Sequence, residues 1–129
     1  MRSYTETTVL AAPSGEVFDY LARVENLPDW ANEFARELKV VDGKHKVVNG
    51  LGEFFFEIRA DAELGVVDMY AGPEESRLAL FPARVVPLGD EQSAFVFTMF
   101  QWPGQPDELF EGQHASLVRE LENLRARFG

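Results

Sequence analysis

The C-terminal stretch 107–128 carries a hydrophobic stripe that contains one histidine. The stripe residues follow one another at steps of four and three, and they are Phe110, His114, Leu117, Leu121, Leu124 and Phe128. Residues three and four positions apart share one face of an α-helix, so this spacing predicts one long C-terminal helix. Five of the six stripe residues are apolar, and the reason for an imidazole at the sixth position has to come from the fold.

The N-terminal part of the chain changes its pattern twice. Residues 3–11 alternate and are rich in Thr and Val, which predicts a strand. A helix is predicted over about 14–24, with Ser14 as its N-cap. Pro28 interrupts it, because a proline nitrogen cannot donate a hydrogen bond and its ring clashes with the preceding turn. A second short helical segment is predicted from the spacing of Leu27, Trp30 and Phe34.

From Arg36 onward the period becomes two, which is typical of strands. Six strands are predicted, over about 36–41, 44–48, 52–60, 66–71, 76–86 and 92–102. Asp42-Gly43 and Asn49-Gly50 are the strongest two-residue hairpin signals, because both central positions of such a turn need a positive φ. Since the other connections are also short, the six strands should form an antiparallel meander.

These elements give the order strand, two short helices, six strands and a long helix. The fold class is therefore α+β, with a seven-stranded antiparallel sheet and the long helix packed on it. No repeat or linker interrupts the 129 residues, so we expect a single domain over 1–129.

Charge and composition narrow the classes of partner. The chain has 12 Lys and Arg against 22 Asp and Glu, a net charge of −10. Nucleic-acid binding needs clustered cations, and we expect no nucleic-acid partner and no docking on anionic lipid. No stretch reaches membrane-spanning length, so we expect no membrane insertion. The absence of cysteine and of an apolar signal segment favours a soluble, cytoplasmic protein.

Metal and cofactor sites are not predicted. The two histidines, His45 and His114, lie far apart in the sequence, and the chain has no cysteine, so no metal-ligand spacing exists. There is also no Gly-rich phosphate loop and no Gly-x-Ser-x-Gly elbow. The 11 phenylalanines instead indicate much apolar surface, hidden in a tight core or around a pocket.

Two segments resemble a known family. Residues 12–21, APSGEVFDYL, and residues 26–30, NLPDW, are similar to the first helix and the start of the second in the START-like superfamily, also called SRPBCC. The resemblance implies a helix-grip fold, in which a curved sheet grips the C-terminal helix around an apolar cavity. The polyketide cyclase/dehydrase branch looks closest. Because the superfamily includes binders, carriers and enzymes, the resemblance leaves the function open.

His114 has three interpretations in such a fold. It is a structural histidine with satisfied partners, a cavity residue that contacts the polar end of a ligand, or a general acid/base, a role that histidine side chains often take. No partner for it can be assigned from the sequence.

The implied cavity suggests a set of ligand-binding residues. In the strand 52–60, Phe54 and Phe56 share the face expected to point inward. Arg84 shares parity with the apolar residues of its strand, so it must pair, reach water or meet an anionic ligand group. The expected ligand-binding residues are Trp30, Phe54, Phe56, Tyr70, Arg84, Phe110, His114 and Leu117.

Three functions remain open from the sequence. The first is binding of a small, largely hydrophobic ligand between the sheet and the long helix. The second is a polyketide cyclase/dehydrase-type enzyme in which His114 moves a proton. The third is a protein-interaction module without a ligand.

The strands 76–86 and 92–102 are apolar on both of their faces. A sheet with one face in water should alternate, so something should cover the second face. We therefore expect a homodimer through this region.

Overall fold

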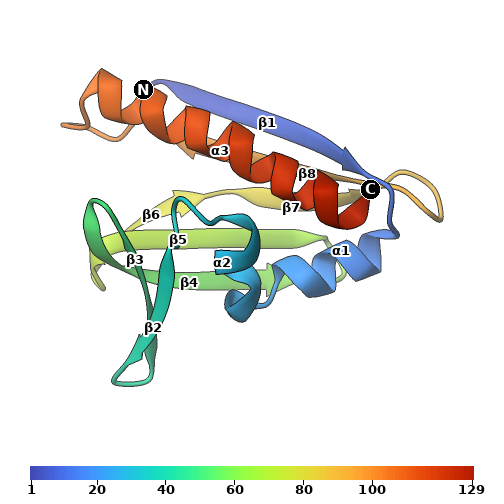
Figure 1. The fold of residues 1–129 in the computed structure, drawn as a ribbon, viewed down its shortest axis with the longest axis horizontal. Coiled ribbons are helices and arrows are strands. Elements are labelled where there is room, and N and C mark those ends of the chain that lie inside the picture. The colour runs from blue at the N-terminus through green and yellow to red at the C-terminus, as the bar shows by residue number, and fades with distance from the viewer.

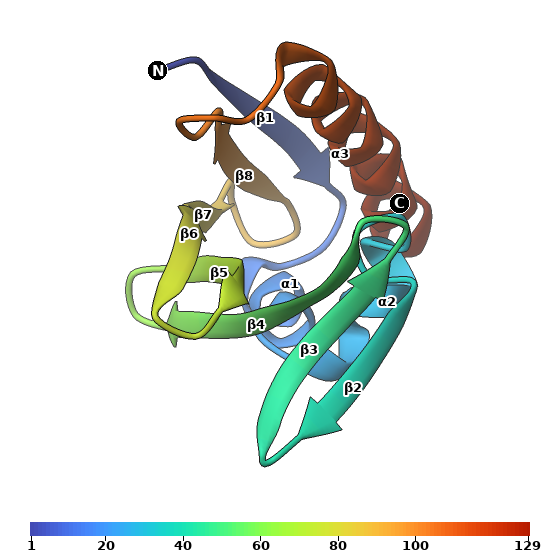
Figure 2. The ribbon, with the colours of Figure 1, turned by 90° about the vertical axis from the view of Figure 1, so that its left-hand side faces the viewer.

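A curved antiparallel sheet forms the body of the protein, and a long helix runs along its concave side (Figures 1 and 2). The computed structural model describes residues 1–129. The strands are β1 (Ser3–Leu10), β2 (Glu37–Val41), β3 (Lys44–Asn49), β4 (Gly52–Asp61), β5 (Val66–Glu74), β6 (Arg77–Phe81), β7 (Ala83–Pro87) and β8 (Ser93–Phe100). Their order in the sheet is β1-β8-β7-β5-β4-β3-β2, and β6 pairs with β5. The predicted α+β fold class is confirmed.

One predicted strand is divided in two. The segment 76–86 forms β6 and β7, with Pro82 between them. Pro82 has no N–H to give to a neighbouring strand, so the ladder breaks there. The sheet consequently counts eight strands where the sequence predicts seven, although its path through the fold is the one expected.

Four helical segments complete the chain: α1 (Ser14–Leu21), the short 3₁₀ helix η1 (Val24–Asn26), α2 (Leu27–Trp30) and α3 (Asp107–Phe128). The first helix ends earlier than predicted, at Leu21. Ser14 is not its N-cap: Pro13 takes that position, and no side chain caps the helix. Pro28 lies in the first turn of α2, where a proline needs no N–H partner.

The two predicted hairpin turns differ in outcome. Asp42 and Gly43 both have positive φ, at 52° and 77°, as the Asp-Gly signal requires. The second turn is displaced by one residue, because Asn49 is still paired with Gly52 and the loop consists of Gly50 and Leu51. The Asn49 side chain stabilises this turn, because its Oδ1 accepts from the backbone N–H of Leu51, at 2.9 Å.

The core lies between the concave face of the sheet and the helices. It takes inward-facing residues from most strands, so that Phe56 of β4, Met69 of β5 and Phe95 of β8 are buried. From α3 it takes the predicted stripe, with Phe110 and Leu124 wholly buried. Full burial of side chains of this size contributes roughly 1.5–3 kcal/mol each, which fixes the helix on the sheet.

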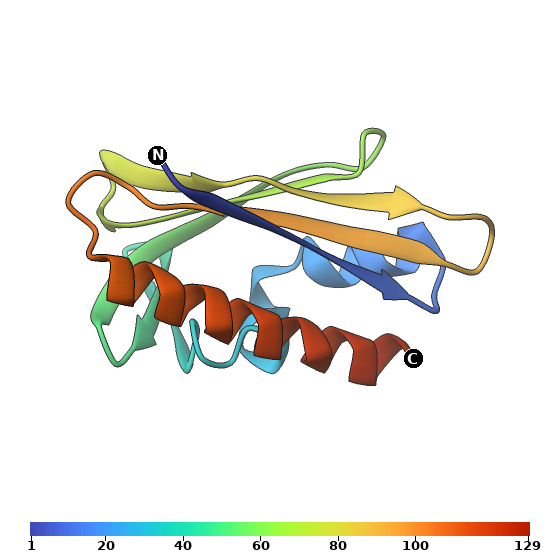
Figure 3. The same cartoon turned by 90° about the horizontal axis from the view of Figure 1, so that it is seen from above.

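The long helix α3 lies close to the edge strand β1 (Figure 3). Tyr4 of β1 donates to the Glu111 carboxylate, at 2.7 and 2.8 Å from its two oxygens. On the other side of α3, the segment that joins α2 to β2 is hydrogen-bonded to Glu120. None of the helices is long and apolar enough to cross a membrane.

Candidate ligand-binding site

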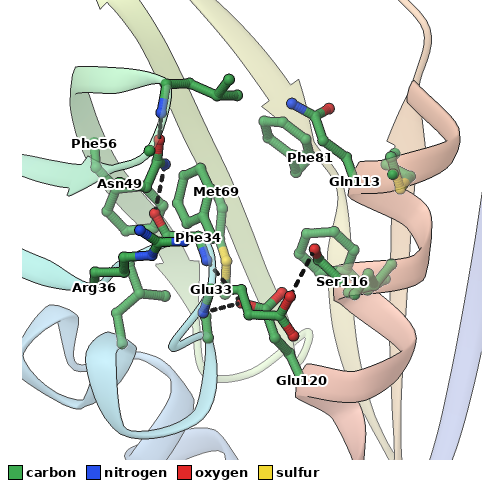
Figure 4. A pocket seen from close by; sticks show the side chains of 18 of the residues that line it. Glu33, Phe34, Arg36, Asn49, Phe56, Met69, Phe81, Gln113, Ser116 and Glu120 are labelled. Carbon is green, nitrogen blue, oxygen red and sulfur yellow. Dashed lines mark hydrogen bonds between the residues drawn. The ribbon is translucent and has the colours of Figure 1, made fainter. Parts of the chain in front are cut away.

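A cavity of about 480 Å³ lies between α3, the concave face of the sheet and the segment between α2 and β2 (Figure 4). This volume falls in the range of sites that hold small organic molecules, about 300–1,000 Å³. Of its 21 lining residues, 12 are hydrophobic, so the interior favours an apolar ligand. The lining residues are Leu27, Trp30, Ala31, Glu33, Phe34, Arg36, Asn49, Gly50, Leu51, Phe56, Met69, Phe81, Phe97, Met99, Glu108, Leu109, Gly112, Gln113, Ser116, Leu117 and Glu120.

The sheet supplies one apolar wall of the cavity. Met69 and Phe81 are directly opposite each other on β5 and β6, so they project to the same face. Phe56 comes from β4, beside β5, and its ring lies 5.8 Å from that of Phe34. These side chains point inward because residues two apart on a strand share one face, and that face is the concave one here.

Glu120 is a buried carboxyl group in the cavity wall. Only 4% of its surface is exposed. Its Oε2 accepts from the backbone N–H of Glu33, at 3.1 Å, and from that of Phe34, at 3.0 Å. Burial raises the pKa of Glu120 from its ordinary value of 4.5 to about 7, against the two backbone donors, which lower it. The group therefore changes its charge near neutral pH.

Glu33 also ties the same segment to α3. It receives two hydrogen bonds from the Arg119 guanidinium, at 2.8 and 2.7 Å, and one from the Ser116 hydroxyl, at 3.0 Å. The Arg119 guanidinium holds the pKa of Glu33 below its ordinary value. Glu33 is thus the charged carboxylate of the pair, and its negative charge adds to the raised pKa of Glu120.

Two polar residues stand on the opposite side of the cavity from α3 (Figure 4). Asn49 donates through Nδ2 to the backbone oxygen of Phe34, at 2.7 Å, which holds the 31–36 segment against β3. Arg36 is exposed and forms no ion pair with a carboxylate. It is the one cationic residue among those that line the cavity.

His114 does not line the cavity. Its Nε2 lies 2.7 Å from Oε1 of Glu6, and its ring is stacked on that of Tyr4. Both partners belong to β1, so the imidazole occupies the contact between α3 and the edge of the sheet. The imidazole therefore has one hydrogen-bond partner and one aromatic neighbour within the protein.

The structure separates the expected ligand-binding residues into three groups. Trp30, Phe56 and Leu117 line the cavity. Phe54, Phe110 and His114 pack elsewhere on the concave side, where the Phe110 ring is stacked on Tyr4 and Phe54 packs against the core.

Tyr70 and Arg84 form the third group and lie on the convex face. Tyr70 shares its face with Leu80 opposite it, and the Arg59 guanidinium lies 4.0 Å from the centre of its ring. Arg84 is exposed, and its guanidinium donates to the backbone oxygen of Leu64, at 3.1 Å. Of the alternatives expected for Arg84, the structure therefore shows a side chain that reaches water and has a hydrogen-bond partner.

Sequence reasoning missed Glu120 as a site residue. A signal was present, because Glu120 stands three positions after Leu117 and four before Leu124, on the flank of the buried stripe. A carboxylate at such a position must be buried or redirect the helix, and buried charges gather at functional sites. Met69 and Phe81 were also missed, since their faces depend on sheet register.

The known structures with similar folds agree on the architecture. XoxI from Bacillus cereus matches with a TM-score of 0.76 at 15% identity, over 99% of this chain and 96% of that one. The Zhui aromatase/cyclase from Streptomyces sp. R1128 matches with a TM-score of 0.69 at 19% identity, over 97% and 90%. The Aha1 dimer from Colwellia psychrerythraea matches with a TM-score of 0.71 at 15% identity, over 99% and 96%. No family model and no curated protein matches the sequence.

These matches establish the fold. The chain has the helix-grip fold that the sequence resemblance implied. At identities of 15–19% they leave the ligand and the chemistry of this chain to its own residues.

Proposed function

We propose that this protein binds a small, largely hydrophobic molecule in the cavity between α3 and the sheet. The observation that carries the proposal is the cavity itself: about 480 Å³, with an apolar majority in its lining and a few polar groups on α3 and on the 31–36 segment. This combination of apolar walls and few polar groups is typical of sites for small molecules.

The other two functions receive less support. The cyclase/dehydrase alternative relies on His114, whose imidazole faces Glu6 and Tyr4 rather than the cavity. An interaction module without a ligand does not by itself account for an apolar hollow of this size beneath α3. Ligand binding accounts for both observations.

Blocking the cavity from inside tests the proposal. Gly112 lies in the lining, and a Cβ added there meets no atom within 4 Å. A Gly112→Phe variant should place its ring in the cavity and reduce the binding of Nile red, a neutral apolar dye, at least tenfold. Native mass spectrometry of freshly purified wild type should in addition reveal any small molecule that co-purifies.

The matched control is Ala115→Phe, which adds the same ring to an exposed position of the same helix outside the cavity. It should bind the dye as the wild type does. Equal dye binding by wild type and Gly112→Phe would show that the dye does not enter the cavity and would contradict the proposal.

A further inference from the structure

We infer that the cavity selects apolar molecules whose polar end donates a hydrogen bond, such as alcohols, phenols and protonated amines, and that Oε1 of Glu120 is the acceptor. This inference rests on the proposed function and names the ligand class for the same cavity. It also predicts that molecules that end in a carboxylate bind more weakly.

The free acceptor is the first argument. Both backbone N–H groups that reach Glu120 donate to Oε2, and Oε1 has no hydrogen-bond partner in the protein. No fully enclosed side-chain nitrogen or oxygen lacks a partner. Oε1 is therefore open to the cavity that Glu120 lines. A carboxylate oxygen without a donor is costly in so buried a position, and a ligand donor would remove that cost.

The structural role of Glu120 does not explain Oε1. One oxygen is enough to hold the backbone of Glu33 and Phe34, and a neutral acceptor would do so without the cost of burying a charge. A carboxylate has a second acceptor oxygen, and it can be charged or neutral. Both properties suit a group whose second oxygen accepts a hydrogen bond from a ligand in the cavity.

The distribution of charge is the second argument. Among the lining residues, Glu33, Glu108 and Glu120 are acidic and Arg36 is the one cation. Two charged groups influence the Glu120 carboxyl electrostatically. They are Glu33, which is negative, and Arg119, which is already bonded to Glu33. A ligand carboxylate beside Glu120 would meet like charge in a poorly solvated place, whereas an ammonium or hydroxyl would not.

The placement of the walls gives the ligand its orientation. The aromatic and thioether side chains of Phe56, Met69 and Phe81 come from the sheet, and Glu120 comes from α3 on the other side (Figure 4). An apolar body packed on the sheet would therefore turn its polar end toward α3.

Three ligands that share a ten-carbon chain and differ in their polar end test which end the cavity prefers. They are decan-1-ol, decylamine and decanoate, used below their micellar concentrations. At pH 8 the amine is protonated, as its resemblance to the Lys side chain requires. Each competes with Nile red for the wild-type protein. Decanol and decylamine should bind at least tenfold more tightly than decanoate, a difference of about 1.4 kcal/mol.

Glu120→Gln removes the charge and keeps an acceptor for the backbone of residues 33 and 34. It should weaken decylamine roughly tenfold and should not weaken decanoate. Glu122→Gln is the control, since it removes the same charge from an exposed position of α3 that does not line the cavity. It should leave all three affinities unchanged, and near-ultraviolet circular dichroism checks that both variants fold.

The outcomes separate this inference from the proposed function. If none of the three ligands displaces the dye, cavity binding itself is wrong, and the inference falls with it. If decanoate binds as tightly as the amine, the inference alone is wrong. Loss of decanoate binding in Arg36→Gln would then identify the exposed cation as the recognition group. The wild-type series decides these cases even if Glu120→Gln does not fold.

Discussion

Nε2 of His114 lies 2.7 Å from Oε1 of Glu6, and this contact explains the histidine in the hydrophobic stripe. The imidazole is also stacked on Tyr4, with ring centroids 3.7 Å apart and planes at 7°. The stripe position of residue 114 faces the edge strand β1, where polar and aromatic groups from strand and helix meet. The cavity uses a neighbouring face of the same helix, which includes Gly112 and Ser116.

We expect His114→Ala to lower stability and to leave ligand binding unchanged. The change removes a part-buried hydrogen bond and an aromatic stack, which together should cost about 1–2 kcal/mol in the free energy of unfolding. Urea denaturation measures the cost, and Nile red titration measures the binding. Glu6→Gln and the double variant complete a cycle that isolates the pair. A large loss of dye binding in a fully folded His114→Ala protein would contradict this prediction and show that His114 takes part in ligand binding.

Stability should depend on pH through Glu120. The carboxyl loses its proton near pH 4.5 in the unfolded chain and near pH 7 in the folded protein. Between these values the folded protein binds more protons, so the free energy of unfolding falls as pH rises from about 4.5 to about 7. At about 1.4 kcal/mol per pKa unit, the full effect is on the order of 3 kcal/mol.

The comparison with Glu120→Gln isolates this effect from other titrations. Glu33 and Glu111 have lowered pKa values, so each loses stabilising interactions as pH falls, but both proteins share them. In urea unfolding experiments, the free energy of unfolding of the variant relative to that of the wild type should rise by about 2–3 kcal/mol between pH 5 and pH 8.5. A constant difference across that range would show that Glu120 titrates as an ordinary carboxyl.

Filling the helix position at Gly112 should stabilise the protein. A glycine inside a helix costs roughly 0.5–1 kcal/mol relative to alanine, and the added methyl group of Gly112→Ala meets no atom within 4 Å. The thermal midpoint should therefore rise by a few degrees, which calorimetry measures. A lower midpoint would indicate that the glycine backbone itself is needed, for example for close approach of a partner.

Much of the fold could be predicted from the pattern of apolar positions. Local signals are strong where one periodicity persists, as in α3, and where a turn needs a special backbone, as at Asp42-Gly43. The errors fall where several signals compete. Ser14 is a good capping residue, but Pro13 before it already sets the extended backbone that an N-cap needs. Asn49 is a good turn residue, but it remains in the ladder with Gly52.

The site was harder to predict than the fold, because a cavity is a property of the packing of distant elements. Strand parity correctly predicted that Phe56 points inward. The sequence left the faces of Tyr70 and Arg84 undecided, and the sheet register places both on the other face. The position of α3 relative to β1 determined that His114 faces Glu6 and that Glu120 faces the cavity. A hydrophobic stripe shows which side of a helix is buried. It does not show which residues on that side pack against the sheet and which line a cavity.

The convex face of the sheet provides the last prediction, a homodimer. Part of this face is covered within the chain, since Lys46 lies 4.4 Å from the ring of Phe55 and Arg59 covers Tyr70. Leu78 and Leu80 remain half-buried beside them. If a second copy covers them, light scattering at micromolar concentration should give twice the chain mass of 14.6 kDa, and Leu80→Lys should halve it. Leu64→Lys, in an exposed turn, is the control. A wild-type mass of one chain would exclude the dimer at that concentration and show that lysine and arginine side chains suffice to cover this face.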